Sequence, residues 1–289
     1  LSENPAAKAL LLEAEGRDRH PLYHLPAGFA KMTKGIGSWG WQTVPQRHMR
    51  GMQIRYTQAK VIGGGSSINA QLYTRGNAQD YDDWRQMGCT GWGYDDVLPH
   101  FRKAEDNDTF ENRFHGKGGP LGVSQPIAPL PVCEAYFNAA AELGIPRNMD
   151  INGETQDGTC YYQLTQRNAR RSSAAMAYLA PNRGRANLTV QMGAQVGRLI
   201  VDNGRATGVE MMDGAQLMAS SEVIMSAGAV GTPRLLQLSG IGPADHLTGL
   251  GIKVVLDQPQ VGENLQDHLD LYCIAELRGP FSYDRYTQP

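Results

Sequence analysis

The 289-residue sequence has few cysteines, and none of them lie close together. Closely spaced pairs such as C-x-x-C mark metal clusters, and dense cysteine patterns mark disulfide frameworks. The absence of both patterns is typical of a protein from a reducing compartment, so we expect a cytoplasmic location. The cysteines are Cys89, Cys133, Cys160 and Cys273.

Histidines with the spacing of metal ligands are also scarce. His20 and His24 have an i, i+4 spacing, which would place two imidazoles on one face of a helix. Pro21 and Pro26 disfavour a helix here, because proline lacks the backbone N–H that a helix uses. We therefore predict no metal site.

Long apolar runs and an excess of one charge are absent as well. No stretch of about 18 consecutive apolar residues occurs, so we expect no membrane span. The formal net charge of −2 gives no electrostatic footprint for nucleic acid or for an anionic membrane surface. The composition, 41% hydrophobic and 19% charged, is that of a globular protein with one large or two modest domains.

Glycine, in contrast, is abundant, and one glycine run stands out. Residues 63–65 are three consecutive glycines, preceded by the apolar Val61 and Ile62 and followed by Ser66 and Ser67. Glycine reaches positive φ and lets a ligand approach bare backbone, so such a turn offers amide and hydroxyl donors to an anionic or carbonyl-rich ligand. The alternative is a flexible joint between two folded pieces. The apolar residues on both sides of the run favour the ligand-binding turn.

An apolar segment near the beginning predicts a nucleotide site. Residues 8–15 (KALLLEAE) are typical of a buried parallel strand, and Glu13 just past its end suits a ribose diol. In a dinucleotide-binding unit this acid lies about 20 residues after a G-x-G-x-x-G turn. Only 12 residues precede Glu13, none of them glycine, and the first is Leu1. We infer an internal fragment without the first strand and phosphate turn. The alternative is a helix end with a solvated Glu13.

A second strand-to-helix junction is expected near the end of the sequence. Residues 222–225 (EVIM) predict a buried strand that runs into the small-residue turn and helix of residues 226–242. This order places backbone amides at a helix N-terminus, where negative charge is stabilised. Alternatively, the glycines of this junction serve packing only.

The rest of the pattern predicts a mixture of helices and strands. Asn203-Gly204 and Asp213-Gly214 are hairpin turn signals, and Asp80 and Asp95 are the expected N-caps of two short helices. Helices are expected at 80–87, 95–105, 132–143 and 169–181, and strands at 53–56, 187–202 and 253–256, with a further strand near 123.

Two segments resemble the signatures of one enzyme family. IGGGSSINAQLYTRGNAQDYDDW, residues 62–84, resembles the first signature of the glucose–methanol–choline (GMC) flavin oxidoreductases, and GAVGTPRLLQLSGIG, residues 228–242, resembles the second. Further segments look like the family in the right order, so the similarity spans nearly the whole sequence. It is greatest toward the bacterial alcohol and choline dehydrogenases.

The resemblance implies an α/β fold with an FAD/NAD(P)-binding Rossmann-like domain and an α+β substrate-binding domain, both incomplete. Residues 1–110 and 187–270 would form the two parts of the FAD-binding domain. Residues 111–186 would belong to a substrate or cap domain, and residues 271–289 would begin the substrate-binding domain.

The resemblance also implies the residues that bind FAD. Glu13 would bind the ribose of the FAD adenosine, Val196 would present its backbone to the adenine, and Ala70 would lie against the reactive edge of the isoalloxazine ring. Ala227 and Gly228 would approach the cofactor from the turn before a helix. The implied cofactor-binding residues are Glu13, Val61, Gly63, Gly64, Ser66, Ser67, Asn69, Ala70, Gln71, Leu72, Val196, Ala227 and Gly228.

Some positions depart from the family pattern. Ile68 stands where some members have a histidine that is covalently bound to the flavin, so we expect non-covalent FAD. Residues 58–60 (QAK) replace the usual Arg-Gly-Lys/Arg, and Glu15 stands where a second glycine is common. None of these changes removes an expected ligand.

The implied reaction is the oxidation of a primary alcohol, choline-like or another small one, by hydride transfer to flavin N5 while a base takes the hydroxyl proton. The expected partners are this alcohol and an electron acceptor, oxygen or a quinone. The catalytic histidine of the family would lie past Pro289, so we assign no catalytic residue here. Among the histidines present, His268 is the best candidate to replace the catalytic base, but we favour a structural role for it in a loop. The alternatives are a flavin-containing hydroxynitrile lyase and an inactive FAD-binding fragment.

Overall fold

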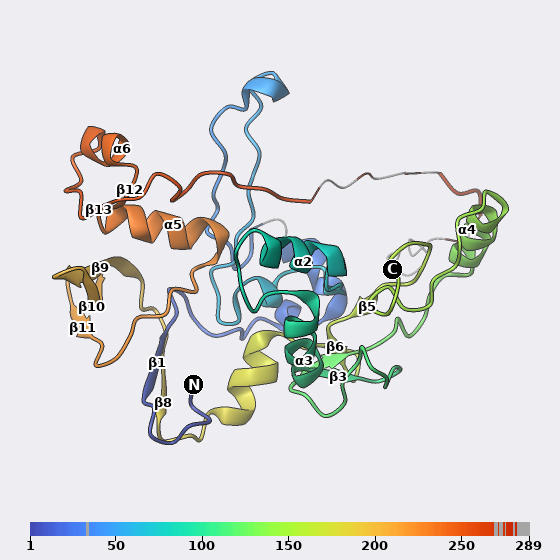
Figure 1. Cartoon of the computed structure of the whole chain (residues 1–289). Coiled ribbons are helices and arrows are strands. Elements are labelled where there is room, and N and C mark those ends of the chain that lie inside the picture. Colours follow the sequence, from blue (N-terminus) through green and yellow to red (C-terminus); the bar gives the residue numbers. More distant parts are fainter. Residues whose placement is uncertain (33–34, 269–270, 272–273, 275, 280, 282–289) are drawn as a thin grey trace. The chain divides into compact units, whose positions relative to one another are not determined.

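A computed structural model describes residues 1–32, 35–268, 271, 274, 276–279 and 281 of the chain (Figure 1). The chain forms two compact units. Unit 1 contains Leu1–Arg17, Lys60–Ile62 and Arg185–Cys273, and unit 2 contains Asp18–Ala59, Gly63–Gly184 and Ile274–Pro289. A division by contacts does not say what each unit binds, so the expected assignment to cofactor and substrate domains stays a prediction. Most of the expected segment 271–289, including Cys273, lies outside the described residues.

A parallel strand pair begins unit 1. Strand β1 (Ala9–Leu12) pairs in parallel with β8 (Leu188–Gln191), and Ala9 lies opposite Leu188. The predicted parallel strand is therefore confirmed, and Glu13 directly follows its C-terminal end. The strand is less buried than expected, since Leu10 is 48% exposed.

An antiparallel meander follows in unit 1. Strand β9 (Val196–Asp202) pairs with β10 (Arg205–Met211), which pairs with β11 (Gln216–Met218). The Asn203-Gly204 turn has φ values of 49° and 76°, as a tight two-residue hairpin requires, so this prediction is confirmed. The segment 187–202, which was expected to be extended, contains the two strands β8 and β9.

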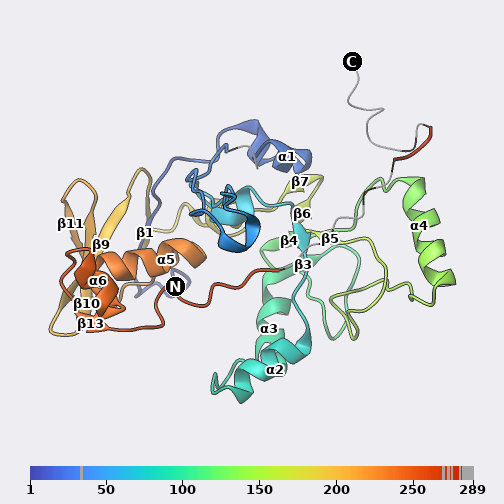
Figure 2. The ribbon, with the colours of Figure 1, turned by 90° about the horizontal axis from the view of Figure 1, so that it is seen from above.

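Helix α5 (Gly228–Leu238) covers this meander (Figure 2). Leu236 of α5 packs against a buried apolar cluster made of Ala194, Leu199, Val209 and Met211. The strand expected at 222–225 is wrong, because this segment pairs with no strand among the described residues. The unit ends with β12 (Ile241–Gly242), α6 (Ala244–Gly249) and β13 (Leu256–Asp257), and β12 pairs with β13 in parallel. The strand predicted at 253–256 thus begins three residues later.

Unit 2 opens with short helical turns and a long two-stranded arm. The arm, residues 38–59, extends from the rest of the unit and is closed by isolated antiparallel bridges (Figure 1). The strand expected at 53–56 is therefore no more than part of this bridged arm. The helical turns of this region are η1 (Pro21–Tyr23), η2 (Pro26–Gly28), α1 (Phe29–Met32), η3 (Arg47–Met49) and η4 (Gly64–Ser67).

Two neighbouring helices, α2 (Ala78–Gln86) and α3 (Tyr94–Ala104), confirm the helices predicted at 80–87 and 95–105. The expected N-caps are wrong, because Asn77 and Gly93 cap the helices. Asp80 lies three residues inside α2, and its side chain accepts a hydrogen bond from the Asn77 backbone N–H at 3.2 Å. An acid at this position completes a capping box. Asp80 therefore does mark the beginning of the helix, but the N-cap itself lies three residues earlier.

Short strand pairs form the remainder of unit 2. The helix predicted at 132–143 is α4 (Pro131–Glu142), and it ends before Gly144 as expected. The helix predicted at 169–181 begins late, because Arg170–Arg171 is strand β7 and only then follow η5 (Ala175–Leu179) and η6 (Ala180–Asn182). The strand expected near 123 is β4. The pairs are β2 (Leu72–Tyr73) with β5 (Gln163–Leu164), β3 (Glu105–Asn107) with β4 (Leu121–Val123), and β6 (Gln166–Arg167) with β7.

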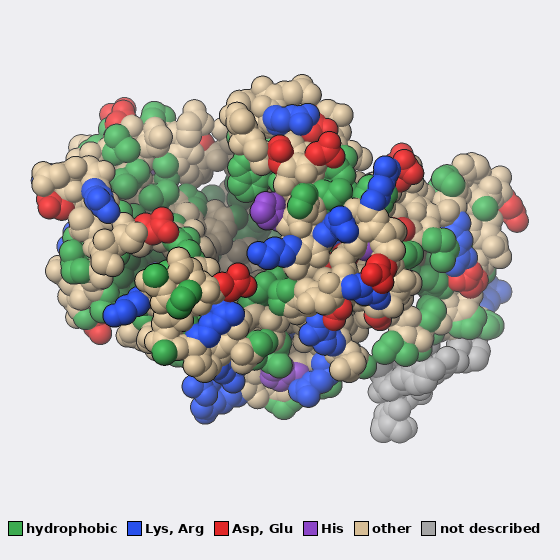
Figure 3. All heavy atoms as spheres, turned by 60° about the horizontal axis from the view of Figure 1, so that its bottom comes forward, with side chains coloured by type: hydrophobic (Ala, Val, Ile, Leu, Met, Phe, Trp, Pro, Cys, Tyr) green, Lys and Arg blue, Asp and Glu red, His purple; other side chains and the backbone are tan. Residues whose placement is uncertain are grey.

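The surface has no large region of a single charge on the face shown in Figure 3, where Lys and Arg side chains are interspersed with Asp and Glu. Every helix in the described part of the chain is too short or too polar to reach across a bilayer. Among the described residues, no group of three His, Cys, Asp or Glu side chains is arranged to hold a metal ion.

Candidate functional site

The glycine run forms a compact loop in unit 2, which we call the glycine loop (residues 63–71). Its first part is the 3-10 turn η4, and in the sequence it directly follows the last residue of a unit 1 segment, Ile62. Gly63 has a φ of 88°, and a Cβ there would lie 2.5 Å from Ser67 Oγ. At Gly64 and Gly65 a Cβ would meet no atom within 4 Å. Gly63 and Gly64, whose φ is 56°, are therefore required for the turn itself, and Gly64 and Gly65 leave bare backbone beside open space.

The Ser66 hydroxyl braces this loop. It donates a hydrogen bond to the Gly63 carbonyl at 2.6 Å and accepts one from the Ala174 backbone N–H at 2.8 Å. The neighbouring Ser67 is 1% exposed. A ligand would have to compete with these bonds for the Ser66 hydroxyl, so the backbone amides of the loop are its more available donors.

A buried arginine holds the second half of the glycine loop. Arg171 Nη1 donates to the Ser66 carbonyl at 3.1 Å and, at 2.8 Å each, to the carbonyl and side-chain oxygens of Asn69. Arg171 is 3% exposed, and burial lowers the pKa of its guanidinium to about 10. Our sequence interpretation missed this residue, although the basic start of the 169–181 segment was a signal for it.

The loop ends in a strained but well-fixed residue. Gln71 has a φ of 68°, which is uncommon for a side chain other than glycine. Its backbone N–H donates to Asn69 Oδ1, its side-chain amide donates to the Pro26 carbonyl, and its own carbonyl accepts from the Thr165 N–H. The flanking Ala70 and Leu72 are exposed. The backbone at Ala70 is thus fixed while its side chain remains accessible.

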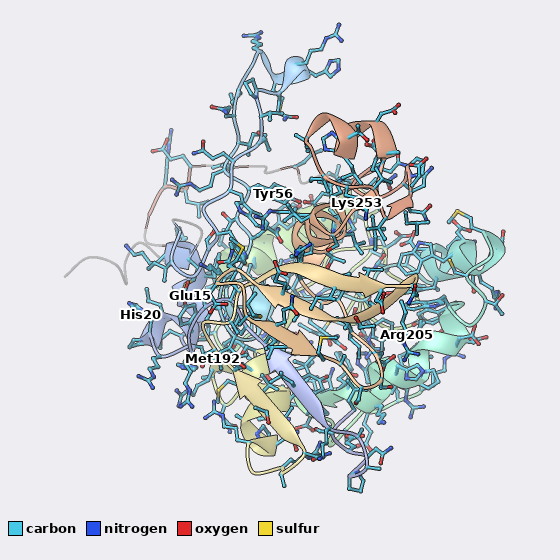
Figure 4. The ribbon with its side chains drawn as sticks, turned by 90° about the vertical axis from the view of Figure 1, so that its left-hand side faces the viewer. Glu15, His20, Tyr56, Met192, Arg205 and Lys253 are labelled. Carbon is cyan, nitrogen blue, oxygen red and sulfur yellow. The ribbon has the colours of Figure 1, made fainter. Side chains whose placement is uncertain are left out.

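In unit 1, Glu13 lies where strand β1 ends. Its carboxylate accepts a hydrogen bond from the Glu15 N–H at 3.1 Å, and its backbone carbonyl accepts from the Ala194 N–H at 2.8 Å. The second bond brings Glu13 beside the segment that leads into Val196. Partial burial raises the pKa of Glu13. Figure 4 shows Glu15 and Met192 past the ends of β1 and β8, where this segment begins.

The other predicted residues of unit 1 lie in two places. Val61 is 1% exposed and therefore offers a ligand little side-chain surface. Ala227 and Gly228 lie at the N-terminus of α5, where the Ala227 N–H donates to Thr232 Oγ1 at 3.1 Å and Gly228 has a φ of 83°. The predicted turn before a helix is confirmed, and a ligand role for each of these residues stays a prediction.

Unit 2 also contains a buried charged cluster that the sequence did not reveal. His115 lies between two carboxylates, with Nδ1 2.9 Å from Glu105 Oε1 and Nε2 2.9 Å from Asp150 Oδ2. Arg75 Nη2 forms a 2.6 Å ion pair with Glu105. Asn107 donates its two amide hydrogens to Glu105 and Gln163. Because the lowered pKa of Glu105 keeps it ionised and an ionised carboxylate only accepts, the hydrogen between His115 and Glu105 comes from the imidazole.

In this cluster each charged group stabilises the ionised form of its neighbour. Burial alone would lower the pKa of His115, but hydrogen bonds to Asp150 and Glu105 outweigh it and raise the pKa. Burial alone would raise the pKa of Glu105, but hydrogen bonds from His115, Asn107 and the Gly116 N–H lower it. Because both ring nitrogens of His115 face carboxylates, this histidine is not available as a catalytic base. His268 is exposed, as expected for a loop histidine.

Comparison with known proteins gives consistent results. The GMC oxidoreductase family profile matches residues 29–270. The chain is 41% identical, over 94% of its length and 50% of the relative, to an oxygen-dependent choline dehydrogenase of Sinorhizobium fredii. It is 40% identical, over 100% of its length and 50% of the relative, to the mitochondrial choline dehydrogenase of Homo sapiens. It is 39% identical, over 97% of its length and 52% of the relative, to an alcohol dehydrogenase [acceptor] of Pseudomonas putida.

Solved structures share the fold. Pyridoxine 4-oxidase from Mesorbium loti matches with a TM-score of 0.84 and 34% identity, over 90% of this chain and 52% of the other. An FAD-dependent oxidoreductase from Chaetomium thermophilum matches with a TM-score of 0.87 and 32% identity, over 92% of this chain and 49% of the other. The chain therefore spans about half the length of the proteins that it matches.

Proposed function

The chain belongs to the GMC oxidoreductase family, and we propose that the protein containing it oxidises the CH–OH group of a primary alcohol with FAD. When bound, FAD supplies flavin N5 as the acceptor of the hydride from the alcohol carbon. A choline-like or other small alcohol is the proposed substrate, since the similar relatives are named choline dehydrogenase and alcohol dehydrogenase. Oxygen is the proposed electron acceptor, because the Sinorhizobium relative is named oxygen-dependent. A cytoplasmic location stays part of the proposal.

The glycine loop is the observation that carries this proposal. Gly64 and Gly65 present backbone beside open space, and the loop carbonyls of Ser66 and Asn69 are occupied by Arg171. The N–H groups of Ile68, Asn69 and Gln71 are also bonded within the loop, so the N–H groups of Gly64 and Gly65 are the proposed donors to a ligand. Such a surface suits the phosphates and ring carbonyls of FAD. The donors present therefore fit this cofactor.

The adenosine part of FAD is assigned to unit 1. A partly buried carboxylate directly after a parallel strand is placed to accept hydrogen bonds from ribose hydroxyls, which is the role proposed for Glu13. Its link to Ala194 fixes the chain that leads to Val196. The N-terminus of α5, at Ala227 and Gly228, is proposed to approach the cofactor with the favourable end of the helix dipole, although the Ala227 N–H already donates to Thr232.

FAD is proposed to bind without a covalent bond to the loop. Ile68 is aliphatic and 7% exposed, so the position that would carry a flavin-linked histidine has no nucleophile. No base is assigned to this chain, because His115 is enclosed by carboxylates and His268 is an exposed loop residue. The chain's proposed tasks are thus to bind and orient the cofactor.

The test uses the complete protein and a panel of primary alcohols that includes choline. We expect yellow protein with flavin absorbance, and bleaching of that absorbance when a substrate alcohol is added without oxygen. Restoring oxygen, or adding a quinone-type acceptor, should return the colour and identify the acceptor. Protein without flavin would overturn the proposal, and turnover of a cyanohydrin without bleaching would favour the lyase alternative.

A further inference from the structure

Arg171 has an unusual combination of burial and bonding. It lies on strand β7 beside Arg170, which is exposed, but its own side chain is 3% exposed. All three side-chain hydrogen bonds of Arg171 leave from one nitrogen, Nη1, and all end on the glycine loop. A single atom therefore fixes the carbonyls of Ser66 and Asn69 relative to each other.

The other half of the guanidinium is unsatisfied. Nε and Nη2 of Arg171 are buried without a hydrogen-bond partner in the described chain. No Asp or Glu forms an ion pair with Arg171 in the part of the chain that the structure describes, whereas the buried Arg75 is paired with Glu105. At neutral pH the group is cationic, so the described part of unit 2 encloses a positive charge without a matching carboxylate.

Such a charge is expensive to bury. Removing an ion from water costs several kcal/mol even after the protein relaxes, and neutral carbonyls offset this only in part. If Arg171 served only to hold these three oxygens in place, it would need no net charge, because an amide or a hydroxyl group would donate hydrogen bonds as well. The positive charge is therefore the part of Arg171 that the loop contacts leave unexplained.

We propose that Arg171 is a positioning residue for the cofactor, which fixes the glycine loop and whose uncompensated charge stabilises the negative charge that FAD gains with the hydride. This inference rests on the proposed function. A hydride brings two electrons and one proton, so the accepting ring becomes anionic unless a further proton arrives. A cation enclosed beside the loop favours that state and raises the reduction potential of the flavin.

The test separates the charge from the hydrogen bonds in the complete, FAD-loaded protein. Arg171→Gln keeps an N–H donor but removes the charge, and Arg171→Lys keeps the charge. Arg170→Gln, at the exposed neighbour on the same strand, is the matched control. For each variant we would measure FAD per chain by absorbance, the dissociation constant for FAD, and the reduction potential in a titration against reference dyes.

We expect Arg171→Gln to have a more negative flavin potential than wild type and to bind FAD about tenfold more weakly. Arg171→Lys should have a potential close to that of the wild type, and Arg170→Gln should match the wild type in all measurements. Equal potentials in Arg171→Gln and wild type would overturn the inference.

Failure to fold does not leave the question open. If Arg171→Gln is unfolded by circular dichroism, the lysine variant decides, because a folded Arg171→Lys protein with a clearly more negative potential contradicts a role for the charge. If the wild-type protein binds no FAD, the proposed function itself fails, and that outcome is distinct from a normal cofactor with an unchanged potential.

Discussion

At the scale of single residues, Ala70 shows how a fixed backbone and an accessible side chain combine. Asn69 is held by Arg171 on one side, and Gln71 is held by hydrogen bonds with Asn69, Pro26 and Thr165 on the other. The exposed methyl group of Ala70 therefore stands on backbone that cannot easily move away. If the flavin lies where we propose, a larger side chain here would extend toward it rather than be absorbed by the loop.

We predict that Ala70→Leu displaces the flavin ring and lowers turnover of the complete enzyme by about 100-fold, since errors of about 1 Å in positioning have effects of this size. Flavin absorbance per chain and steady-state kinetics with the best alcohol are the measurements. Thr74→Leu, at an exposed position just after the loop, is the control. Normal flavin content and turnover in Ala70→Leu would show that the side chain does not face the ring.

At the scale of elements, the contact between α5 and β9 depends on one serine. Ser239, just past the end of α5, accepts a hydrogen bond from the Leu199 N–H of β9 at 2.8 Å and donates to the Leu235 carbonyl at 2.5 Å. Both Ser239 and Leu199 are buried. The C-terminal end of the helix is thus tied to the meander, which fixes the helix whose N-terminus is assigned to the cofactor.

We predict that Ser239→Ala lowers the free energy of unfolding by about 1–3 kcal/mol, because it leaves the buried Leu199 N–H without an acceptor. Ser239→Thr keeps the hydroxyl and should lose less. Ser221→Ala, at an exposed serine of the same unit, should change stability by less than about 0.5 kcal/mol. Urea unfolding followed by circular dichroism measures the stability of all three variants. Equal stabilities of Ser239→Ala and wild type would show that the Ser239–Leu199 hydrogen bond does not stabilise the fold.

Local signals predicted the elements that depend on neighbouring residues. The Asn203-Gly204 hairpin and helix α4 before Gly144 follow from turn chemistry and apolar periodicity that a short window contains. The strand at 222–225 was predicted wrongly, since it pairs with no strand among the described residues. The helix predicted at 169–181 begins only at Ala175, because Arg170–Arg171 pairs with the adjacent strand β6 across the Asn168-Ala169 turn, whose φ values are 52° and 57°.

The same limit applies to the candidate site. Glu13 and the glycine loop were predicted because each carries its signal within a few residues, and the fold places Glu13 directly after a parallel strand. Arg171 lies 102 positions from Asn69 in the sequence, and no local pattern links them. The cluster around His115 was not predicted for the same reason, since Glu105 and Asp150 contact His115 only in the folded unit.

At the scale of the whole molecule, the His115 cluster makes the stability of unit 2 depend on pH. The folded pKa of His115 is raised above its unfolded value of about 6.5. A raised pKa contributes stability that is fully present below the unfolded value and is lost as the pH rises through the folded value. The lowered pKa of Glu105 acts oppositely, and its contribution is lost as the pH falls through the folded value.

We predict that His115→Gln costs about 3 kcal/mol of unfolding free energy at pH 6, as expected when a buried ion pair loses one partner. The cost should shrink as the pH rises from the unfolded pKa of about 6.5 toward the raised folded pKa of His115. Chemical unfolding at several pH values, with the exposed His100→Gln as control, measures this difference. A difference that is constant from pH 6 to pH 9 would mean that folding does not raise the pKa of His115.

The pairing of β1 with β8 has a consequence for how the protein is made. Nearly all of unit 2 is encoded between these two strands, so β1 leaves the ribosome long before its partner exists. At usual elongation rates the delay is on the order of ten seconds. During that time the edge of an apolar strand is open to other nascent chains. Slower translation therefore lengthens the period in which a chaperone must shield the leucines of β1.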